Sequence, residues 1–432
     1  MNFALFFVIK IINIFDYSII SSTFSVVYIN INQGDTKMTK KMTVSLISIA
    51  IIAFLLTFIT GAINTVPYTG VRDFAVQQFH STDAAIGYSF ALFQVGYFVG
   101  VVLNGLLFKI LKTKLEIFIT MAIYVIVSLF LYAISSNFEL SVMLLIMGFG
   151  IGMAYTIPNY LIVNSFEGRT RSSILNIGDF FFSVGSFVIP VVAAFVFAHN
   201  LSWQLVYASL FVAFAVIIVL TCFSKFPKTG RELKLEQNNK IIAYSKWNKN
   251  IYLMLVMVFF YLVSYMGFNY WTFNDMTVNF HSSIPEATSG IMYFWIFYAV
   301  GCAISSVALK FVRIHKYLIG SFILTIIAFI LILNAGSAAT FCIYISILGL
   351  GCATIFSSSL SYTTLLIKKP SPMLISTFIA VCTIGSIVAQ FGTSYIQEVY
   401  GLNAVTIVSL VVMIISTLLF ISVALNKKNN PA

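Results

Sequence analysis

The sequence predicts an all-α membrane protein with twelve transmembrane helices in two six-helix bundles. The chain has 432 residues, of which 60% are hydrophobic and 9% are charged, and its mean hydropathy is +1.00. Soluble domains carry far more charge. Apolar runs of roughly 20 residues recur, which is long enough for a helix to cross a bilayer. Membrane barrel strands would instead show short alternating patterns.

The expected spans follow one another with short polar connections, and Gly, Pro and polar residues interrupt them as is common in membrane bundles. After Met38 the apolar segments are 43–67, 84–108, 115–135, 140–165, 172–197, 203–224, 251–275, 286–309, 317–335, 340–366, 373–398 and 403–425.

The basic residues predict the orientation of these spans. Of the 24 Lys and Arg residues, only Lys10 and Arg72 do not fall on the side that holds both ends of the chain. By the positive-inside rule, both termini are expected in the cytoplasm of a bacterium, with the protein in the inner membrane. The net charge of +11 therefore does not indicate nucleic-acid binding, because the cations lie in clusters between apolar runs.

Cysteine and histidine give no sign of a metal site. The five cysteines lie in or next to apolar segments without a CxxC pair, and the four histidines lie in loops or at helix ends. We interpret the cysteines as small apolar residues and expect no cofactor.

Residues 1–37 form a separate problem. The segment is moderately apolar but contains Lys10, Asn13 and Asp16, and it lacks the basic start and cleavage site of a signal peptide. The peptide "NQGDTKM" can be encoded with AAGGAG, a ribosome-binding sequence, shortly before the ATG of Met38. We expect a mis-assigned leader and a native start at Met38; the alternative is a genuine, disordered N-terminal extension or an extra helix.

The expected organisation is an N-terminal bundle at 38–224, a basic cytoplasmic linker at 225–250, and a C-terminal bundle at 251–432 that ends in a short basic tail. The linker carries seven Lys or Arg residues and divides the predicted helices six and six. An amphipathic segment on the lipid surface is the alternative for the linker.

The two halves repeat in sequence. Phe79-His80-Ser81 matches Phe280-His281-Ser282, and Gly148 and Gly150 in "GFGIG" match Gly349 and Gly351 in "GLGCA". These pairs share an offset of 201 positions. Because both halves begin on the same side, the pattern predicts a parallel repeat about an axis along the membrane normal.

Two six-helix bundles in this relation resemble the major facilitator superfamily of transporters. "FEGRTRSSILNIGDFFFSVGSFVIPVVAAF" (166–195) and "PSP" followed by "TIGS" in the second half resemble the TsgA-like branch, and "SILN" with the later Phe, Ser and Gly is more distantly similar to the fucose permeases. The chain departs from these patterns: the loop after the second helix lacks the usual Asp, and the first and fourth helices lack the acids of the sugar importers.

The resemblance implies that the first, fourth, seventh and tenth helices line a central cavity. The polar residues expected there suit a neutral polar solute, because amides and hydroxyls pair with it and aromatic faces stack on it. The alternative is that these residues join helices. The candidates on these helices are Asn64, Thr65, Tyr68, Tyr155, Asn159, Tyr265, Asn269, Trp271, Ser358 and Tyr362, to which Gln94 of the second helix and Gln390 of the second half are added.

Asp179 lies inside an apolar span, where a carboxylate costs roughly 2.5–3.5 kcal/mol on insertion scales and marks a functional candidate. It is predicted to be a gate that pairs with Arg169 or Arg171 in one state; the alternatives are a proton relay and a packing role. On the other side of the membrane, Arg72 and Asp275 are predicted to approach each other in the inward-facing state.

These features predict a secondary active transporter that moves a small, polar, neutral solute by alternating access. A proton or another ion could be the coupling partner, membrane lipid surrounds the chain, and a monomer without nucleic-acid partners is expected. A transporter-like sensor without transport and a multidrug or metabolite efflux pump remain alternatives. A membrane enzyme would need clustered acids or Ser–His pairs near one interface, and the sequence lacks them.

Overall fold

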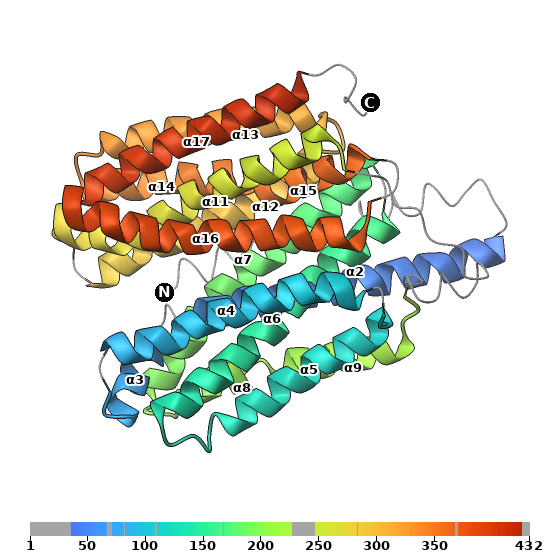
Figure 1. Ribbon diagram of the computed structural model, residues 1–432, viewed down its shortest axis with the longest axis horizontal. Coiled ribbons are helices and arrows are strands. Elements are labelled where there is room, and N and C mark those ends of the chain that lie inside the picture. The colour runs from blue at the N-terminus through green and yellow to red at the C-terminus, as the bar shows by residue number, and fades with distance from the viewer. Residues whose placement is uncertain are drawn as a thin grey trace.

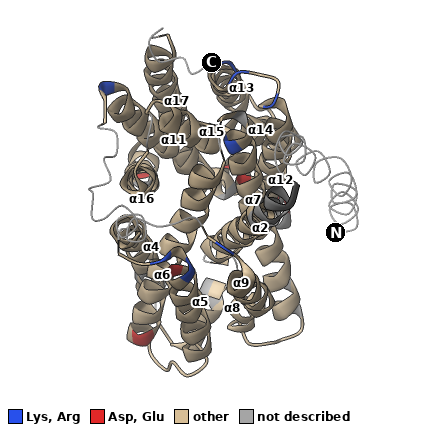
Figure 2. Ribbon diagram, turned by 90° about the vertical axis from the view of Figure 1, so that its right-hand side faces the viewer, with Lys and Arg blue, Asp and Glu red and all other residues tan. Residues whose placement is uncertain are grey.

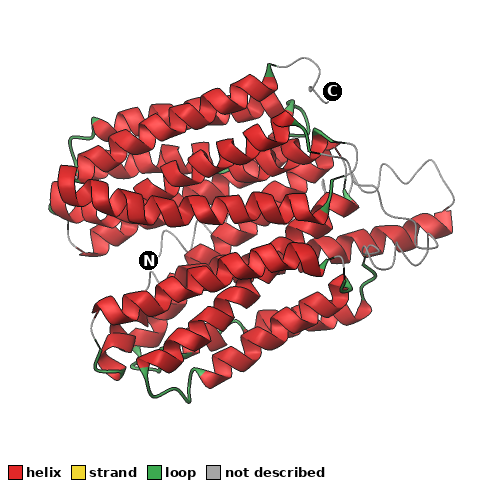
Figure 3. Ribbon diagram, viewed as in Figure 1, coloured by secondary structure: helices red, strands yellow, loops and turns green. Residues whose placement is uncertain are grey.

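The computed structural model describes residues 36–66, 71–81, 83–108, 110–166, 168–226, 247–282, 284–367 and 370–425. Within these ranges, twelve helices are long and apolar enough to cross a membrane, which confirms the predicted count. Figure 3 shows the helical architecture. The predicted leader falls almost wholly outside the described residues.

The N-terminal half contains six spans and, outside them, the short helix α3; Figure 1 shows how they are arranged. Its helices are α2 (Thr36–Thr65), α3 (Val71–Gln78), α4 (Asp83–Leu107), α5 (Thr113–Phe130), α6 (Asn137–Ser165), α7 (Gly168–Ala198), α8 (Leu205–Ala208) and α9 (Phe211–Phe223). The sixth span is formed by α8 and α9 in succession, from Leu205 to Phe223.

The C-terminal half follows the same plan. It contains α11 (Lys249–Asn274), the π-helix η2 (Asp275–Asn279), α12 (Ile284–Ala308), α13 (Ile314–Leu333), α14 (Ala338–Cys352), α15 (Ile355–Leu365), α16 (Pro372–Tyr400) and α17 (Leu402–Ala424). The tenth span is broken between α14 and α15, where the sequence predicts one continuous segment.

Local sequence signals set several helix starts. The Ser136 hydroxyl accepts a hydrogen bond from the Glu139 amide, and the Glu139 carboxylate accepts one from the backbone N–H of Ser136, which forms a capping box at the start of α6. Ser337 and Thr340 form the same box at the start of α14. Ser371 caps α16, whose first residue is Pro372, where the missing N–H of proline costs nothing.

The structure reproduces the sequence repeat in detail. Gly148 lets α6 approach α4 so closely that an added Cβ would lie 2.0 Å from the carbonyl oxygen of Phe93. Its counterpart Gly349 approaches Phe294 in the same way, at 2.5 Å. Both residues of each contact are related by the same offset of 201 positions. The two bundles are therefore each held together by equivalent contacts.

Because consecutive spans run in opposite directions, the helix ends next to Lys112, Lys114, Lys225 and Arg313 lie at one end of the bundle. We call it the basic end; Figure 2 looks onto it. The C-terminal end of α17 also lies there, on the right of Figure 1. The opposite end holds the short connections before α6 and α14.

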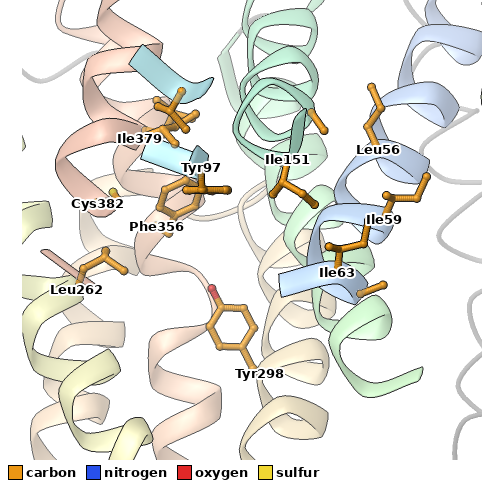
Figure 4. Close-up of a cluster of buried hydrophobic side chains, with 14 of the residues drawn as sticks. Leu56, Ile59, Ile63, Tyr97, Ile151, Leu262, Tyr298, Phe356, Ile379 and Cys382 are labelled. Atoms are coloured by element: carbon orange, nitrogen blue, oxygen red, sulfur yellow. The ribbon is translucent and has the colours of Figure 1, made fainter. Parts of the chain in front are cut away.

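The two halves meet where α7 packs against α12 and α15 and where α4 and α6 pack against α16. Figure 4 shows interior side chains from both halves, with Leu56, Ile59 and Ile63 of α2 on one side and Leu262 and Ile379 on the other. Large apolar residues such as Leu103, Phe130 and Ile327 are exposed on the outside, as a surface in contact with lipid requires.

Candidate functional site

A row of polar residues on α7 contacts the C-terminal half near the basic end. We call the row 171–179 and its partners the polar ladder. Arg171 donates from Nη1 to the hydroxyl of Thr364 at 3.0 Å and from Nε to the carbonyl of Phe166 at 2.9 Å. One residue further, the Ser172 and Ser361 hydroxyls lie 2.6 Å apart. Since α15 supplies Thr364 and Ser361, these bonds join the two halves.

Asn176 occupies the middle of the ladder and bridges two helices of the other half. Its amide nitrogen donates to the Ser358 hydroxyl on α15 at 3.2 Å, and its amide oxygen accepts from Ser305 on α12 at 2.8 Å. Asn176 and both partners are completely buried. Because buried polar groups need partners, these three residues fix α7, α12 and α15 relative to one another.

Asp179 ends the ladder at its deepest point. Ser357 of α15 donates a hydrogen bond to Oδ2 of Asp179, and the residue is 6% exposed. Positions 172, 176 and 179 are spaced by four and three residues, so they share one face of α7. The sequence places a serine or amide at each turn, and the fold aligns this face with the serine-rich α15.

An aromatic cluster lies next to Asp179 and contains rings from both halves. The Tyr155 ring lies 5.9 Å from Phe182 and 5.8 Å from Phe356 of the opposite half, and Phe182 lies 6.1 Å from Trp295 of that half. Phe182 follows Asp179 by three positions on α7, and Phe356 directly precedes Ser357, which donates the hydrogen bond to Asp179. The rings therefore flank the carboxyl group along both helices.

Three members of this cluster keep accessible surface although they contact the other half. Tyr155, Phe182 and Trp295 are only partly buried, while their ring contacts cross between α6, α7, α12 and α15. Partly accessible rings therefore contact one another across the boundary between the two bundles. In the described residues, no group of three His, Cys, Asp or Glu side chains could hold a metal ion.

Comparisons with known proteins agree with this geometry. Residues 6–369 match the family model of the Major Facilitator Superfamily. The chain belongs to this superfamily of membrane transporters. It is also similar to the Protein TsgA homologs of Yersinia pestis (strain Pestoides F) and Yersinia pseudotuberculosis (serotype O:1b, strain IP 31758), each 26% identical over 353 residues, which are 82% of this chain and 89% of each relative.

Solved structures of the superfamily share the fold. A variant of the E. coli fucose:proton symporter FucP superposes with a TM-score of 0.71 at 14% identity, covering 88% of this chain and 99% of that one. The proton:xylose symporter XylE, bound to 6-bromo-6-deoxy-D-glucose, gives 0.72 at 11% identity, with 87% and 95% covered. At these identities the likeness concerns the fold alone.

The predicted cavity residues of the N-terminal half differ in their hydrogen-bond and ring contacts in this structure. The side-chain amides of Asn64 and Asn159 donate to the carbonyls of Thr60 and Tyr155, one turn earlier in their own helices, and Thr65 donates to Gly61. Tyr155 belongs to the aromatic cluster, and Gln94 is partly buried on α4. Tyr155 is thus the candidate of this half that the structure connects to Asp179.

The C-terminal candidates divide in the same way. Tyr265 stacks on Tyr261 with ring centroids 4.9 Å apart and on Phe294 at 6.1 Å. Ser358 belongs to the polar ladder, whereas Trp271 donates to Thr393 at 3.0 Å. The amide nitrogen of Asn269 and the hydroxyl of Tyr362 are buried without a hydrogen-bond partner in the described part of the chain.

Four of the predicted site residues have side chains that the structure does not describe. Tyr68 is not described, and neither are the side chains of Arg72, Arg169 and Gln390. The Arg72–Asp275 approach and the Asp179–Arg169 pairing therefore stay predictions. In this structure Arg171 binds Phe166 and Thr364, and Asp275 accepts a hydrogen bond from Asn279 at 2.9 Å.

Sequence reasoning missed several members of the site. Ser305 and Ser306 of α12 contact Asn176 and Ser173, and their only signal is a pair of serines in an apolar run. Phe182, Trp295 and Phe356 look like ordinary apolar residues in the sequence. Their role depends on contacts between the halves, which a residue pattern within one helix does not reveal.

The break in the tenth span is stabilised by side chains from neighbouring helices. The Tyr261 hydroxyl donates to the carbonyl of Cys352 at 3.0 Å, and the Cys302 thiol donates to the carbonyl of Ala353 at 3.2 Å. Irregular backbone inside a membrane requires such partners. Discontinuous helices often lie at transporter binding sites. The break lies between Cys352 and Ile355, directly before Phe356 and Ser357.

Proposed function

We propose that the protein is a secondary active transporter that moves a small, polar, neutral solute across the bacterial inner membrane by alternating access. One observation carries the proposal: the polar ladder joins the halves at the basic end, while partly exposed rings of both halves lie next to its deepest member, Asp179. A site between two rocking bundles is how parallel-repeat transporters operate.

The proposed state of this structure is outward-facing. The basic residues assign the basic end, and with it both termini, to the cytoplasm. The ladder then closes the cytoplasmic side, and the aromatic cluster would be reached from the opposite side. In the inward-facing state the bonds of Ser172, Asn176 and Asp179 to the C-terminal half must break.

The composition of the cluster supports a neutral polar solute. Aromatic faces stack on apolar ring surfaces, while hydroxyl and amide groups supply directional hydrogen bonds. The described span residues next to the cluster include no Lys or Arg; Arg171 is at the other end of the ladder, eight positions before Asp179. A strongly anionic solute would lack a counter-charge there.

We assign Asp179 to the gate and propose a proton as the coupling ion. The carboxyl contacts Ser357 of the opposite half in the closed ladder, so the two must part when the cytoplasmic side opens. Its charge then needs another partner, for which Arg169 and Arg171 on the same helix are nearest in sequence. A group whose partners differ between two states can bias their populations.

The test is uptake into proteoliposomes loaded with a pH-sensitive dye and challenged with a panel of neutral polar solutes, including monosaccharides and polyols. Accumulation of one solute with a matching proton signal is the expected result. Binding without accumulation would instead indicate a sensor, and outward movement of apolar compounds would indicate an efflux pump.

A crosslink across the ladder supplies the control within the same protein. Ser172 and Ser361 lie in direct hydrogen-bond contact, so Ser172→Cys and Ser361→Cys together should form a disulfide that holds the basic end closed. Oxidation should abolish uptake and a reductant should restore it, while each single variant should be unaffected by oxidation. The exposed Cys222 is replaced by serine in all these chains.

A further inference from the structure

Glu116 is a second acid inside the membrane part of the chain, distant in the fold from the polar ladder. It lies on the buried face of α5, together with Thr113, Ile117 and Tyr124, and its side chain is 0% exposed. Neither carboxyl oxygen has a hydrogen-bond partner among the described residues. A buried carboxylate without partners is strongly unfavourable, so this group must either hold a proton or lie next to a positive charge.

The register of α5 against α9 places a second helix at the level of Glu116. The two helices are antiparallel, with the Tyr124 and Phe214 rings 5.3 Å apart. Near the basic end, Lys114 Nζ donates to the carbonyl of Cys222 at 2.7 Å. Between these two contacts, Glu116 must lie at the level of Thr221. Thr221 is on the buried face of α9.

Two hydroxyl groups near this level are, like the Glu116 carboxyl group, buried and not hydrogen-bonded to any described residue. The Oγ1 atoms of Thr113 and Thr221 are buried without a hydrogen-bond partner in the described ranges, and the two residues are 1% and 0% exposed. Four unpartnered oxygen atoms therefore lie within about one helical turn of one another along the α5–α9 interface. A group of unsatisfied buried acceptors indicates a missing occupant.

The described lysine side chains near this level belong to the ends of α5 and α9 and not to the middle of the interface between them. On α5, Lys114 binds the end of α9, and Lys112 is exposed at the helix start. Helix α6 carries no Lys, Arg, Asp or Glu after Glu139, and the described side chains of α2 and α9 include none. Lys225 follows α9 beyond its last turn. Glu116 lies in the first turn of α5, where the helix dipole stabilises a negative charge. This stabilisation is small compared with the cost of burying the charge.

We propose that Glu116, Thr113 and Thr221 form a binding site for a small monovalent cation of the Na⁺ type. Hard cations take oxygen ligands, and this set contains oxygen atoms only. One carboxylate neutralises one positive charge, whereas a divalent ion would leave an excess charge in the low-dielectric interior. The site stabilises the α5–α9 contact, and it is independent of solute transport.

The internal repeat limits the site to the N-terminal half. The counterpart of Glu116 at the offset of 201 is Tyr317, and that of Thr113 is Ile314. Neither residue supplies a carboxylate, so the equivalent interface of the C-terminal half has no such set. The expected stoichiometry is one ion per chain.

Thermal unfolding of the purified full-length protein tests the site. NaCl replaces choline chloride at constant ionic strength, and binding of radioactive Na⁺ is measured in parallel. A concentration about 100 times Kd should raise the folded-to-unfolded ratio about a hundredfold. Glu116→Gln and the isosteric Thr221→Val should both lose this dependence and the bound Na⁺. The exposed Glu139→Gln variant is the matched control and should retain both.

Three results would overturn the proposal. The first is a wild-type unfolding temperature that does not respond to Na⁺. The second is Na⁺ binding that survives in Thr221→Val and Glu116→Gln. The third is an unfolding temperature that depends on pH and not on Na⁺, with the dependence lost in Glu116→Gln, because Glu116 would then be a protonated acid. If Glu116→Gln does not fold, Thr221→Val decides the outcome alone.

Discussion

Ser357 of α15 donates a hydrogen bond to the carboxyl group of Asp179 on α7, and this bond crosses from one half of the molecule to the other. The carboxyl thus contacts the opposite bundle at the depth where the polar ladder ends and the aromatic cluster begins. A buried carboxyl that accepts from a neighbouring hydroxyl is stabilised only while the two halves remain in this arrangement. This relationship is the physical basis for assigning Asp179 to the gate.

An Asp179→Asn change should alter both uphill transport and solute exchange by several-fold. Asparagine keeps the size and one acceptor oxygen but loses the charge, so the partner needed in the open state changes. Both rates are measured in proteoliposomes once a solute is identified. Loss of uphill transport with normal exchange would instead assign a proton-carrying role.

Ser183→Ala is the control for this change. The Ser183 hydroxyl donates to the backbone carbonyl of Asp179 within the same helix at 2.8 Å, so its loss perturbs the same turn without touching the other half. Transport by this variant should stay close to wild type. Wild-type rates in Asp179→Asn itself would end the gate assignment and leave a packing role.

Asn176→Ala should shift the protein away from the state in which the basic end is closed. The change removes hydrogen bonds to Ser305 and Ser358, each worth about 0.5–1.5 kcal/mol net. The combined shift of about 1–3 kcal/mol corresponds to roughly 5- to 150-fold in the ratio of the two states. Labelling of Ser361→Cys by a membrane-impermeant thiol reagent from the cytoplasmic side should become faster, and unchanged labelling would argue against the ladder as a closure.

Gly185→Ala should destabilise the N-terminal bundle. An added Cβ would lie 2.1 Å from the carbonyl oxygen of Phe58 on α2. Because this oxygen belongs to the backbone, a change of side-chain rotamer cannot relieve the clash. Overpacking of this kind costs about 1–3 kcal/mol or more. Gly178→Ala on the same helix is the matched control, because its nearest neighbour is Thr57 at 3.9 Å. Equal unfolding temperatures for the two variants would contradict the close α2–α7 approach.

Asp275 should make stability depend on pH. Burial raises the pKa of this carboxyl from 3.8 to about 7, against the opposing hydrogen bond from Asn279. The folded state therefore binds more protons than the unfolded state between these values, and stability should fall as pH rises from 3.8 to about 7. Asp275→Asn should remove this slope and be more stable than wild type above neutral pH. A parallel pH profile for the two proteins would contradict the assignment.

The spans could be predicted because each depends on its own sequence. Apolar length gives the helices, and Ser136 and Ser337 mark two starts at repeat-related positions. The offset of 201 predicts the equivalence of Gly148 and Gly349, and both approach equivalent carbonyls. These features follow from local chemistry and duplication, so one sequence suffices for them.

The site could be predicted only in part. Asp179 is recognisable as a costly acid in an apolar helix, but its partner Ser357 is 178 positions away and depends on how two helices of different halves align. The break between Cys352 and Ile355 is equally hidden, because Tyr261 and Cys302 of other helices satisfy the freed carbonyls. Contacts of this kind are decided by packing between the bundles.

Distance measurements between paired spin labels test alternating access most directly. Lys112 and Arg313 are repeat-related exposed positions at the basic end, and Ser135 and Gly336 are repeat-related exposed positions at the opposite end. In the protein reconstituted in lipid, the transported solute should produce a second population in which the Lys112–Arg313 distance lengthens while the Ser135–Gly336 distance shortens. A single, unchanged distance at both ends, in protein that transports the solute, would contradict the account.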